Sequence, residues 1–217
     1  RNMYRLNVSP ALLEELGPVL QFNYEELASS MVFYAYAILC SQVYLDEFEG
    51  ALFTVNQSDM RARIPIIADR ELFIQIRDLG IRLAELEKAE YHPENLLGFD
   101  YDTICNQIPR NFHLSNSSHP FDEENEELLL TDGTETIKIP CPTALQNLNI
   151  SGYDVVKNVW LKFNSYNFTH CDFTPRDAER LLNFLNTLET HTRIVAEIDT
   201  LMPSVLEDDM PLILPPE

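Results

Sequence analysis

The chain has 217 residues, 45% of them hydrophobic, so it can build a core and is not a wholly disordered chain. No stretch approaches the roughly 20 apolar residues that a membrane-spanning helix needs. Fifteen Lys and Arg residues stand against 35 Asp and Glu, a net charge of −20, which excludes a protein that coats nucleic acid or an anionic membrane by charge alone. Four cysteines without a CxxC pair predict reduced thiols and a cytoplasmic location. Because the chain opens on Arg1, we expect a piece of a longer protein.

Four helices are predicted in the first part of the chain. Ser9 and Asn23 are N-caps, the first followed by Pro10 and the second completed by Glu26 in a capping box. Gly17-Pro18 is predicted to end the first helix. The expected ranges are about 9–16, from 23 to the pause at 41–42, from there through 53, and about 69–90.

The character changes near residue 95, where helical periodicity fades. Asp132-Gly133 between apolar runs is the strongest short-range hairpin signal and predicts two strands within 128–139. A further strand is expected near 144–150 and a short helix over 155–163. Thr174 and Asp177 mark the start of a last helix that runs to about Leu201.

These elements predict an α+β fold. A helical N-terminal part packs on a small mixed or antiparallel β part, and a long helix closes the chain. The expected divisions are a helical subdomain (1–95), a β-containing recognition part with the C-terminal helix (96–202) and an acidic, proline-rich tail (203–217), or one domain in all.

Several kinds of chemistry lack their motifs. Only 6 glycines occur, none in a GxG cluster, and Pro215-Pro216 precedes the terminal residue, so an adenine methyltransferase's cofactor loop and Pro-Pro-aromatic motif are missing. The sequence has no P-loop to bind a nucleotide triphosphate and no G-x-S-x-G motif of a hydrolase. It also lacks the acidic residue two positions before a lysine that a common Mg²⁺-dependent restriction nuclease requires. His170-Cys171 and Cys141 match no ordinary zinc spacing. We therefore expect no catalytic residue, metal or cofactor in this chain.

Two segments carry a resemblance to a known family. The first contains Phe33-Tyr34-Ala35-Tyr36, Arg63-Ile64-Pro65 and the Leu-Ala-Glu-Leu helix that ends at Leu86. The second contains Ser151-Gly152-Tyr153, then Trp160-Leu161-Lys162 and a last helix with Glu-Ile-Asp ending at Asp199. In this order they resemble the C-terminal region of type ISP restriction–modification enzymes, over about residues 10–200.

The resemblance implies a function that composition does not. In that family a nuclease, a helicase-like motor and an adenine methyltransferase precede a C-terminal target-recognition domain. The chain would then be the DNA-binding specificity domain of a restriction–modification or phage-defence enzyme, non-catalytic by itself. Its parent would use S-adenosylmethionine, and ATP with Mg²⁺ where a motor is present. Its partners would be double-stranded DNA and the upstream methyltransferase domain, with no membrane.

Candidate DNA-contacting residues fall in three places, the first two being an interhelical connection and a polar loop. Arg61 and Arg63 form the most basic spot of the first half and can hold a phosphate or a base edge; alternatively, Arg63 pairs with a nearby carboxylate. The stretch 110–116 carries side chains that read bases, arginine for guanine and asparagine for adenine. Its alternative is an ordinary surface loop. The candidates within it are Arg110, Asn111, His113 and Asn116.

The third place follows the Gly152-Tyr153 turn. Lys157 and Lys162 flank Trp160 and can both reach phosphate, although a spacing of five does not put them on one helix face. Tyr153 is an open candidate, for the core or for DNA. Trp160 is predicted to be a core anchor, with a stacking platform as the alternative.

Two functions from different classes remain open on the sequence. The first is the DNA target-recognition module. The second is an acidic protein-interaction or structural module of the same large enzyme that does not contact DNA, which the net charge of −20 favours. A positive groove holding the five predicted cations supports the first, and a negative surface with a large apolar patch supports the second.

Overall fold

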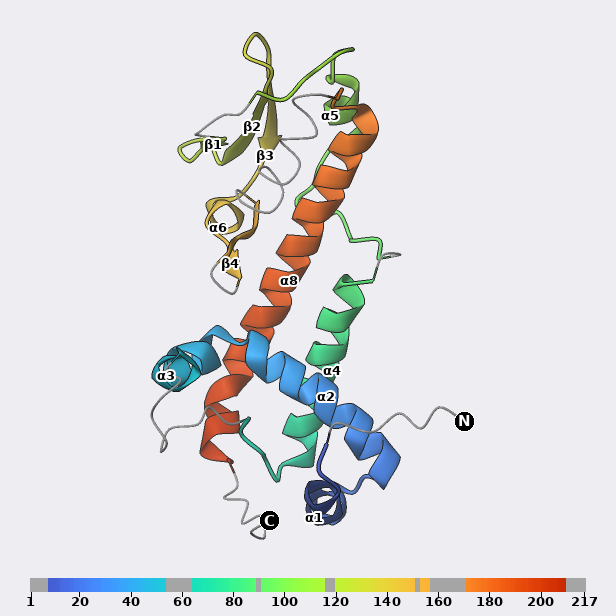
Figure 1. Cartoon of the computed structure of the whole chain (residues 1–217), viewed down its shortest axis with the longest axis vertical. Helices are drawn as coiled ribbons and strands as arrows, with labels where there is room; N and C mark the ends of the chain where they lie inside the picture. The colour runs from blue at the N-terminus through green and yellow to red at the C-terminus, as the bar shows by residue number, and fades with distance from the viewer. Residues whose placement is uncertain are drawn as a thin grey trace. The chain divides into compact units, whose positions relative to one another are not determined.

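A computed structural model describes residues 8–53, 64–88, 91–115, 120–150, 153–156 and 171–209. The chain divides into two compact units, which we treat separately. Unit 1 comprises Arg1–Tyr91 with His191–Glu217, and unit 2 comprises His92–Thr190. Helices dominate the first and a small antiparallel sheet lies in the second, so the α+β prediction is confirmed (Figure 1).

Unit 1 is a helical assembly around an aliphatic and aromatic core. Its most deeply buried members include Leu16, Leu27, Ile76 and Ile198, each fully shielded from solvent. The helices that supply this core are α1 (Pro10–Leu20), α2 (Tyr24–Cys40), α3 (Gln42–Phe53), α4 (Arg70–Leu86) and the C-terminal part of α8 (Pro175–Glu207).

Of the two N-caps predicted in this unit, Asn23 forms a side-chain cap, whereas Ser9 precedes α1 without a side-chain cap hydrogen bond. The Asn23 side chain accepts a hydrogen bond from the Glu26 amide at 3.0 Å and begins α2. Asp69 accepts from the amides of Glu71 and Leu72, at 2.8 and 3.0 Å, and begins α4. Each cap satisfies backbone donors that the first helical turn leaves unpaired.

Two predicted helix ends were wrong, and both concern proline. α1 continues through Pro18 to Leu20, because Leu20 is fully buried and Gln21 then ends the helix in the left-handed conformation (φ 56°). α8 continues through Pro203 to Glu207, because Met202 and Val205 pack into the core of unit 1. In each case buried apolar side chains beyond the proline offset its missing N–H donor.

α2 and α4 cross in close contact. A Cβ added at Gly80 of α4 would lie 2.0 Å from the Phe33 carbonyl oxygen, so only glycine fits. Beside this crossing the buried Tyr34 ring stacks on Phe73, with centroids 4.7 Å apart, and its hydroxyl donates to the Pro65 carbonyl at 2.9 Å. Burial raises the pKa of Tyr34 well above its ordinary value, so the phenol stays neutral.

Unit 2 contains a three-stranded antiparallel sheet in the order β1-β2-β3. Its strands are β1 (Phe121–Asp122), β2 (Glu127–Thr131) and β3 (Thr136–Pro140). Leu128 lies opposite Ile139 and Leu130 opposite Ile137, so one face is apolar and buried. The predicted Asp-Gly hairpin is confirmed, with Gly133 at φ 94°.

The rest of unit 2 surrounds that buried face. α5 (Tyr101–Asn106) begins at the Asp100 cap, and the first part of α8 supplies Leu181, Leu182 and Leu185 to the core. The strand expected near 144–150 is mostly absent: α6 (Thr143–Gln146) precedes a short strand, β4 (Asn149–Ile150), which pairs with β5 (Tyr153–Asp154). Most of the helix expected over 155–163 lies outside the described residues.

One polar side chain is fully enclosed in unit 2. Asn186 of α8 accepts a hydrogen bond from the Leu97 amide at 3.0 Å, and its amide donates to Asn95 and to the Tyr101 hydroxyl. Tyr101 in turn donates to Asn183 at 2.9 Å. The network fixes the segment before α5 on α8, because each buried polar group has a partner.

Many acidic residues have structural roles as acceptors for backbone amides. Asp199 accepts from the Val43 amide at 3.3 Å and from the Ser41 hydroxyl at 2.6 Å, at the start of α3. Asp208 accepts from the amides of Ala68 and Asp69, at 2.9 and 3.0 Å. In the hairpin, Asp132 accepts from two amides and the pKa of its carboxyl is lowered by those bonds. Part of the acidity therefore serves turns and helix starts.

Among the described residues, no single helix is both long and apolar enough to cross a membrane. α2 and the first part of α3 meet that criterion only when taken together, as a pair bent by 74°.

Candidate nucleic-acid interface

The most distinctive polar surface of unit 2 is the segment 110–115, which follows α5. Its side chains alternate: Phe112 and Leu114 are buried, whereas Arg110, Asn111 and His113 are exposed. Ser115 is exposed as well. Arg110 and Asn111 lie in a turn; beyond it the chain presents successive side chains to opposite sides, so Phe112 and Leu114 are buried and His113 and Ser115 face solvent.

The backbone of this segment is fixed at both ends. The Phe173 amide donates to the Phe112 carbonyl at 2.7 Å, and the two rings pack edge to face with centroids 6.4 Å apart. At the far end the Ser115 amide donates to the Thr131 carbonyl at 2.7 Å. Asn111 adopts a left-handed conformation (φ 59°), which asparagine tolerates better than most residues. The polar side chains are thus displayed on a rigid support.

His113 has a charged neighbour on the segment that precedes α8. Its Nε2 lies 3.2 Å from Oδ1 of Asp172, and the two side chains are 46% and 50% exposed. Pairs this open to solvent add little stability, at most about 1 kcal/mol. The contact therefore contributes little to folding, although it places the carboxylate of Asp172 beside the His113 ring.

Most described cations of the protein contact a carboxylate or an aromatic ring, whereas Arg110 has no such partner among the described residues. In unit 2, Lys138 pairs with Glu127 at 2.6 Å and Arg180 with Asp177 at 3.6 Å. Within the described part of the chain, neither Arg110 nor Arg176 has a carboxylate partner, and both are exposed. A guanidinium without an internal partner keeps its donors available for phosphate or a base edge.

The structure brings three of the nine predicted residues together, on the segment 110–115: Arg110, Asn111 and His113. Tyr153 lies in β5, paired with Ile150 and apart from this segment in sequence. The other five predicted residues lie outside the described residues, and their contacts with DNA stay predictions: Arg61, Arg63, Asn116, Lys157 and Lys162.

Sequence reasoning missed Asp172, which lies next to this segment, and did not propose the exposed Arg176 of α8 as a DNA contact. Asp172 contacts His113 across 59 positions of sequence, and no local pattern announces such a pair. The one available signal was the Thr174 helix cap, which Asp177 completes with a hydrogen bond from the Thr174 hydroxyl at 2.6 Å. That cap fixed the start of α8, but not what lies beside it.

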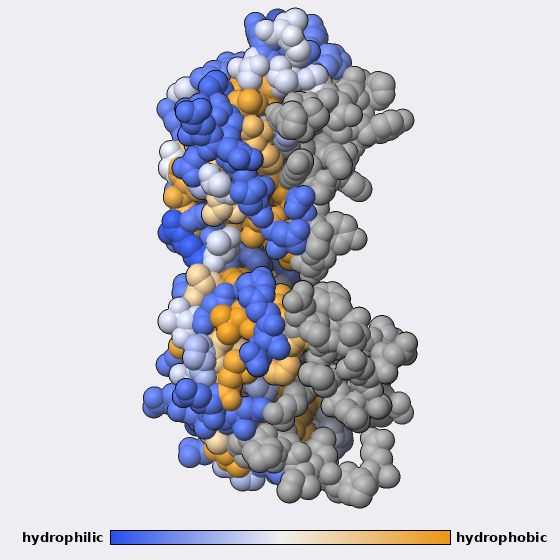
Figure 2. All heavy atoms as spheres, turned by 90° about the vertical axis from the view of Figure 1, so that its left-hand side faces the viewer, coloured by the Kyte–Doolittle hydropathy of each residue, from blue (hydrophilic) through white to orange (hydrophobic). Residues whose placement is uncertain are grey.

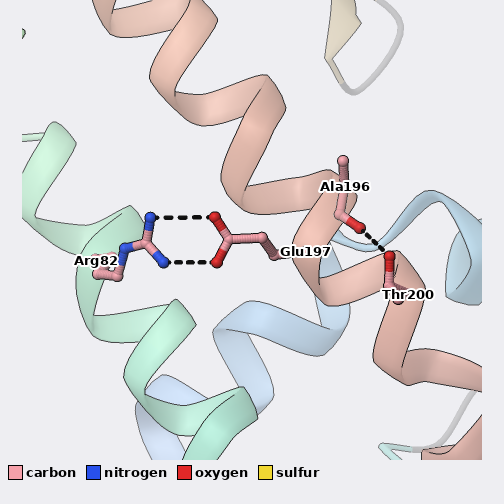
Figure 3. Close-up of polar contacts among 4 residues, drawn as sticks. All are labelled: Arg82, Ala196, Glu197 and Thr200. Carbon is pink, nitrogen blue, oxygen red and sulfur yellow. Dashed lines mark hydrogen bonds and ion pairs between the residues drawn. The ribbon is translucent and has the colours of Figure 1, made fainter.

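Unit 1 has a groove of about 450 Å³ between α4 and α8, lined by both polar and apolar groups. Figure 3 shows Arg82 facing Glu197 across it, with Nη1–Oε2 at 2.7 Å and Nη2–Oε1 at 3.3 Å. The Thr200 hydroxyl donates to the Ala196 carbonyl at 2.9 Å. Because these polar groups already satisfy one another, the groove offers a ligand few open donors. Its lining residues are Gln75, Asp78, Leu79, Arg82, Glu197, Thr200 and Leu201.

Three of the four thiols, those of Cys40, Cys105 and Cys141, are poorly suited to nucleophilic chemistry. Burial raises the pKa of Cys141 to about 12, and it also raises the pKa of Cys40 and of Cys105. A thiol with a raised pKa is mostly protonated and therefore unreactive near neutral pH. Among the described residues, no three His, Cys, Asp or Glu side chains are grouped closely enough to hold a metal ion.

The face drawn in Figure 2 has mainly hydrophilic residues around smaller hydrophobic areas in both units. The exposed large hydrophobic residues among those described include Val32 and Leu39 of α2, which are 55% and 46% exposed. They are seven positions apart and so lie on the same side of the helix.

The fold and the segment 110–115 define a class of protein in which a folded scaffold displays a rigid polar loop, as recognition modules do. The family model of the type ISP C-terminal specificity domain matches residues 3–194, and the chain belongs to that family. The resemblance seen in the sequence is thereby confirmed, and the chain is a target-recognition domain of type ISP restriction–modification enzymes. No curated protein and no solved structure matches the chain.

Proposed function

We propose that unit 2 reads double-stranded DNA through the exposed side chains of the segment 110–115. The observation that carries the proposal is that Arg110, Asn111 and His113 share one rigid exposed segment, with Arg110 lacking an acidic partner among the described residues. Arginine and asparagine supply the donor and acceptor patterns that match guanine and adenine edges in the major groove. Family membership makes DNA the expected ligand.

The acidity of the chain sets the mode of binding that we propose. With a net charge of −20, long-range attraction to phosphate is absent, so contacts must be local and shape-guided. We propose that the methyltransferase domain of the parent enzyme supplies the other half of the DNA clamp. In that enzyme S-adenosylmethionine would serve methylation, and ATP with Mg²⁺ would serve a motor.

The proposal is tested by comparing two cations of unit 2. In the intact enzyme that carries this chain, Arg110→Ala should weaken binding to the preferred duplex by about tenfold and relax preference at one base pair. Lys138→Ala removes the same charge from a cation already paired with Glu127, and should leave both unchanged. The readout is sequencing of duplexes retained from a randomised library, together with titration of the best one.

Equal behaviour of the two variants would contradict a role for this segment. Loss of affinity by the same factor for every sequence would instead show that Arg110 contacts phosphate only.

A second candidate function, an acidic module that docks on another domain of the same enzyme, is favoured by one observation in unit 1. Val32 and Leu39 expose apolar side chains on one side of α2. Replacing both with serine should then separate that domain from the specificity domain in a pull-down of the two expressed as separate chains, while leaving the base preference of an intact enzyme unaltered. Unchanged association would remove this alternative.

A further inference from the structure

We propose that Arg176, in the first turn of α8, contacts a DNA phosphate beside the segment 110–115 and so sets the position of the duplex against that segment. This inference rests on the proposed function, because it requires the segment to face DNA. It goes further by assigning a backbone contact to a residue of another element. Phosphate contacts fix the register and orientation of a duplex without reading its sequence.

The segment 110–115 is joined to the start of α8 through two aromatic residues. The Phe173 amide donates to the Phe112 carbonyl at 2.7 Å, and the two rings pack edge to face. Arg176 follows Phe173 by three residues, which span no more than about 11 Å even when fully extended. Because the major groove is about 12 Å wide, a phosphate that borders a groove occupied by the segment lies at a comparable distance from it.

The backbone at Arg176 is fixed by the cap of α8. The Thr174 amide and hydroxyl both donate to Oδ2 of Asp177, at 3.0 and 2.6 Å. The Ala178 amide donates to the Thr174 carbonyl at 3.0 Å. Since these bonds hold the chain on both sides of Arg176, only its side chain has to be ordered when a ligand binds, which keeps the entropic cost of binding low.

The hydrogen-bond donors of Arg176 are available to a ligand. The residue is exposed, and within the described part of the chain neither its guanidinium nor its backbone amide has an acceptor. A guanidinium presents its donors in a planar fork that matches the oxygens of a phosphate. Arg180, one helical turn later, differs because it pairs with Asp177 at 3.6 Å.

The local charge is more favourable to phosphate than the net charge of −20 suggests. The segments 110–115 and 171–180 together contain three arginines and three acidic residues, which is a formal charge of zero. Two of the three carboxylates have contacts within the protein: Asp177 with Thr174, and Asp172 with His113 at 3.2 Å. A phosphate therefore meets less repulsion here than the average of this surface would give. The charged residues are Arg110, Arg176 and Arg180, with Asp172, Asp177 and Glu179.

The test measures the affinity of the intact enzyme for its preferred duplex and for an unrelated duplex at several salt concentrations. Arg176→Ala should weaken binding to both by about tenfold and leave the sequence selected from a randomised library unchanged. The slope of the logarithm of affinity against the logarithm of salt concentration should become shallower by about 1. Arg176→Lys keeps the charge and should restore most of the affinity, because an ammonium also binds phosphate.

Arg180→Ala is the matched control. It removes the same kind of side chain from the same helix, one turn later, but from a cation that is already paired and 64% exposed. Affinity and salt slope should both remain as in the unsubstituted enzyme. Both alanine variants alter exposed positions, so each should unfold within a few degrees of the unsubstituted enzyme.

Three results would overturn the assignment of Arg176. They are an affinity of Arg176→Ala equal to that of Arg180→Ala, a changed preferred base in Arg176→Ala, or a loss of affinity with an unchanged salt slope. In each case DNA reading by the segment 110–115 stands if Arg110→Ala still relaxes base preference. If Arg110→Ala leaves the selected sequence unchanged while Arg176→Ala weakens binding to every duplex alike, the phosphate contact stands and the proposed reading function fails.

Discussion

The cations of unit 1 and unit 2 differ in their partners. In unit 1 the described ones are engaged within the protein: Arg77 with Asp78, Arg82 with Glu197, Lys88 with Glu85, and Arg70 over the Phe22 ring at 5.2 Å. In unit 2 the described Arg110 and Arg176 have no such partner among the described residues. Net charge alone hides this difference, because both units contain more acidic than basic residues.

The difference indicates which surface can receive an anionic ligand. A guanidinium held in two hydrogen bonds by a carboxylate, as Arg82 is, must lose them before it binds phosphate. Arg110 has no such bonds to lose. We therefore propose that unit 1 serves as the scaffold and that unit 2 contacts DNA.

The largest expected effect is on the scaffold. Gly80→Ala should lower the free energy of unfolding of unit 1 by about 3 kcal/mol, because the new Cβ would collide with the Phe33 carbonyl at 2.0 Å. In an exposed helix the same change stabilises by about 1 kcal/mol, so the sign is diagnostic. Denaturant unfolding measures it, with Ala84→Gly in the same helix as the reference for propensity alone. A stabilised Gly80→Ala variant would show that α2 and α4 do not cross this closely.

The next effect is on the recognition unit. Asn186→Ala should lower the free energy of unfolding of unit 2 by about 2 kcal/mol, because it leaves the buried Leu97 amide without an acceptor and removes a hydrogen-bond partner of Tyr101. The substitution should weaken sequence preference more than Gly80→Ala does at equal destabilisation. If Gly80→Ala weakens it more, recognition does not belong to unit 2.

A smaller effect separates the units by pH. Burial lowers the pKa of His191 in unit 1, against the opposing charge of Glu87. The unfolded chain binds a proton near pH 6.5 and the folded chain does so only at lower pH, so stability is complete above pH 6.5 and falls as the pH drops toward the folded pKa. The free energy of unfolding should change with pH by at most ~1.4 kcal/mol per pH unit on account of His191.

In unit 2 the groups with lowered pKa values are carboxyl groups. Hydrogen bonds from side-chain and backbone groups lower the pKa of Asp100, Asp122 and Asp132, so their contribution is present above their unfolded pKa of about 4 and is lost as the pH falls below it. His191→Gln should flatten the stability profile between pH 7 and 5.5 and leave the acid limb below pH 4 unchanged. Urea unfolding at each pH checks this, and an unaltered profile would contradict it.

The smallest effect is expected at the groove of unit 1. Arg82→Ala should lower the free energy of unfolding of unit 1 by less than about 1 kcal/mol, because both side chains of its ion pair with Glu197 are 51% exposed. It should leave DNA affinity unchanged, in contrast to Arg110→Ala. A tenfold loss of DNA binding on removal of Arg82 would transfer the interface to unit 1.

Local features of this fold were predictable from the sequence. Asn23, Asp69 and Thr174 begin helices because each supplies a side-chain acceptor for amides two or three residues on. Asp132-Gly133 forms the hairpin because glycine permits the positive φ of the turn. Such signals act over a few residues, and the sequence displays them directly.

The helix ends at two prolines and the contacts of the segment 110–115 could not be predicted, because they depend on tertiary packing. Pro18 and Pro203 are predicted helix ends, yet Leu20 and Val205, which follow them, are buried in the core of unit 1. The segment 110–115 was recognised as polar, but its alternation and its contact with Asp172 depend on residues about 60 positions later. Contacts of that kind leave no trace in local periodicity.

Photo-crosslinking of the intact enzyme to its preferred duplex is the most direct measurement. A photoreactive side chain at Ser115, on the exposed segment of unit 2, should crosslink to DNA, and one at Gln75, beside the groove of unit 1, should not. Crosslinking from Gln75 with none from Ser115 would contradict the division of roles on which this account depends.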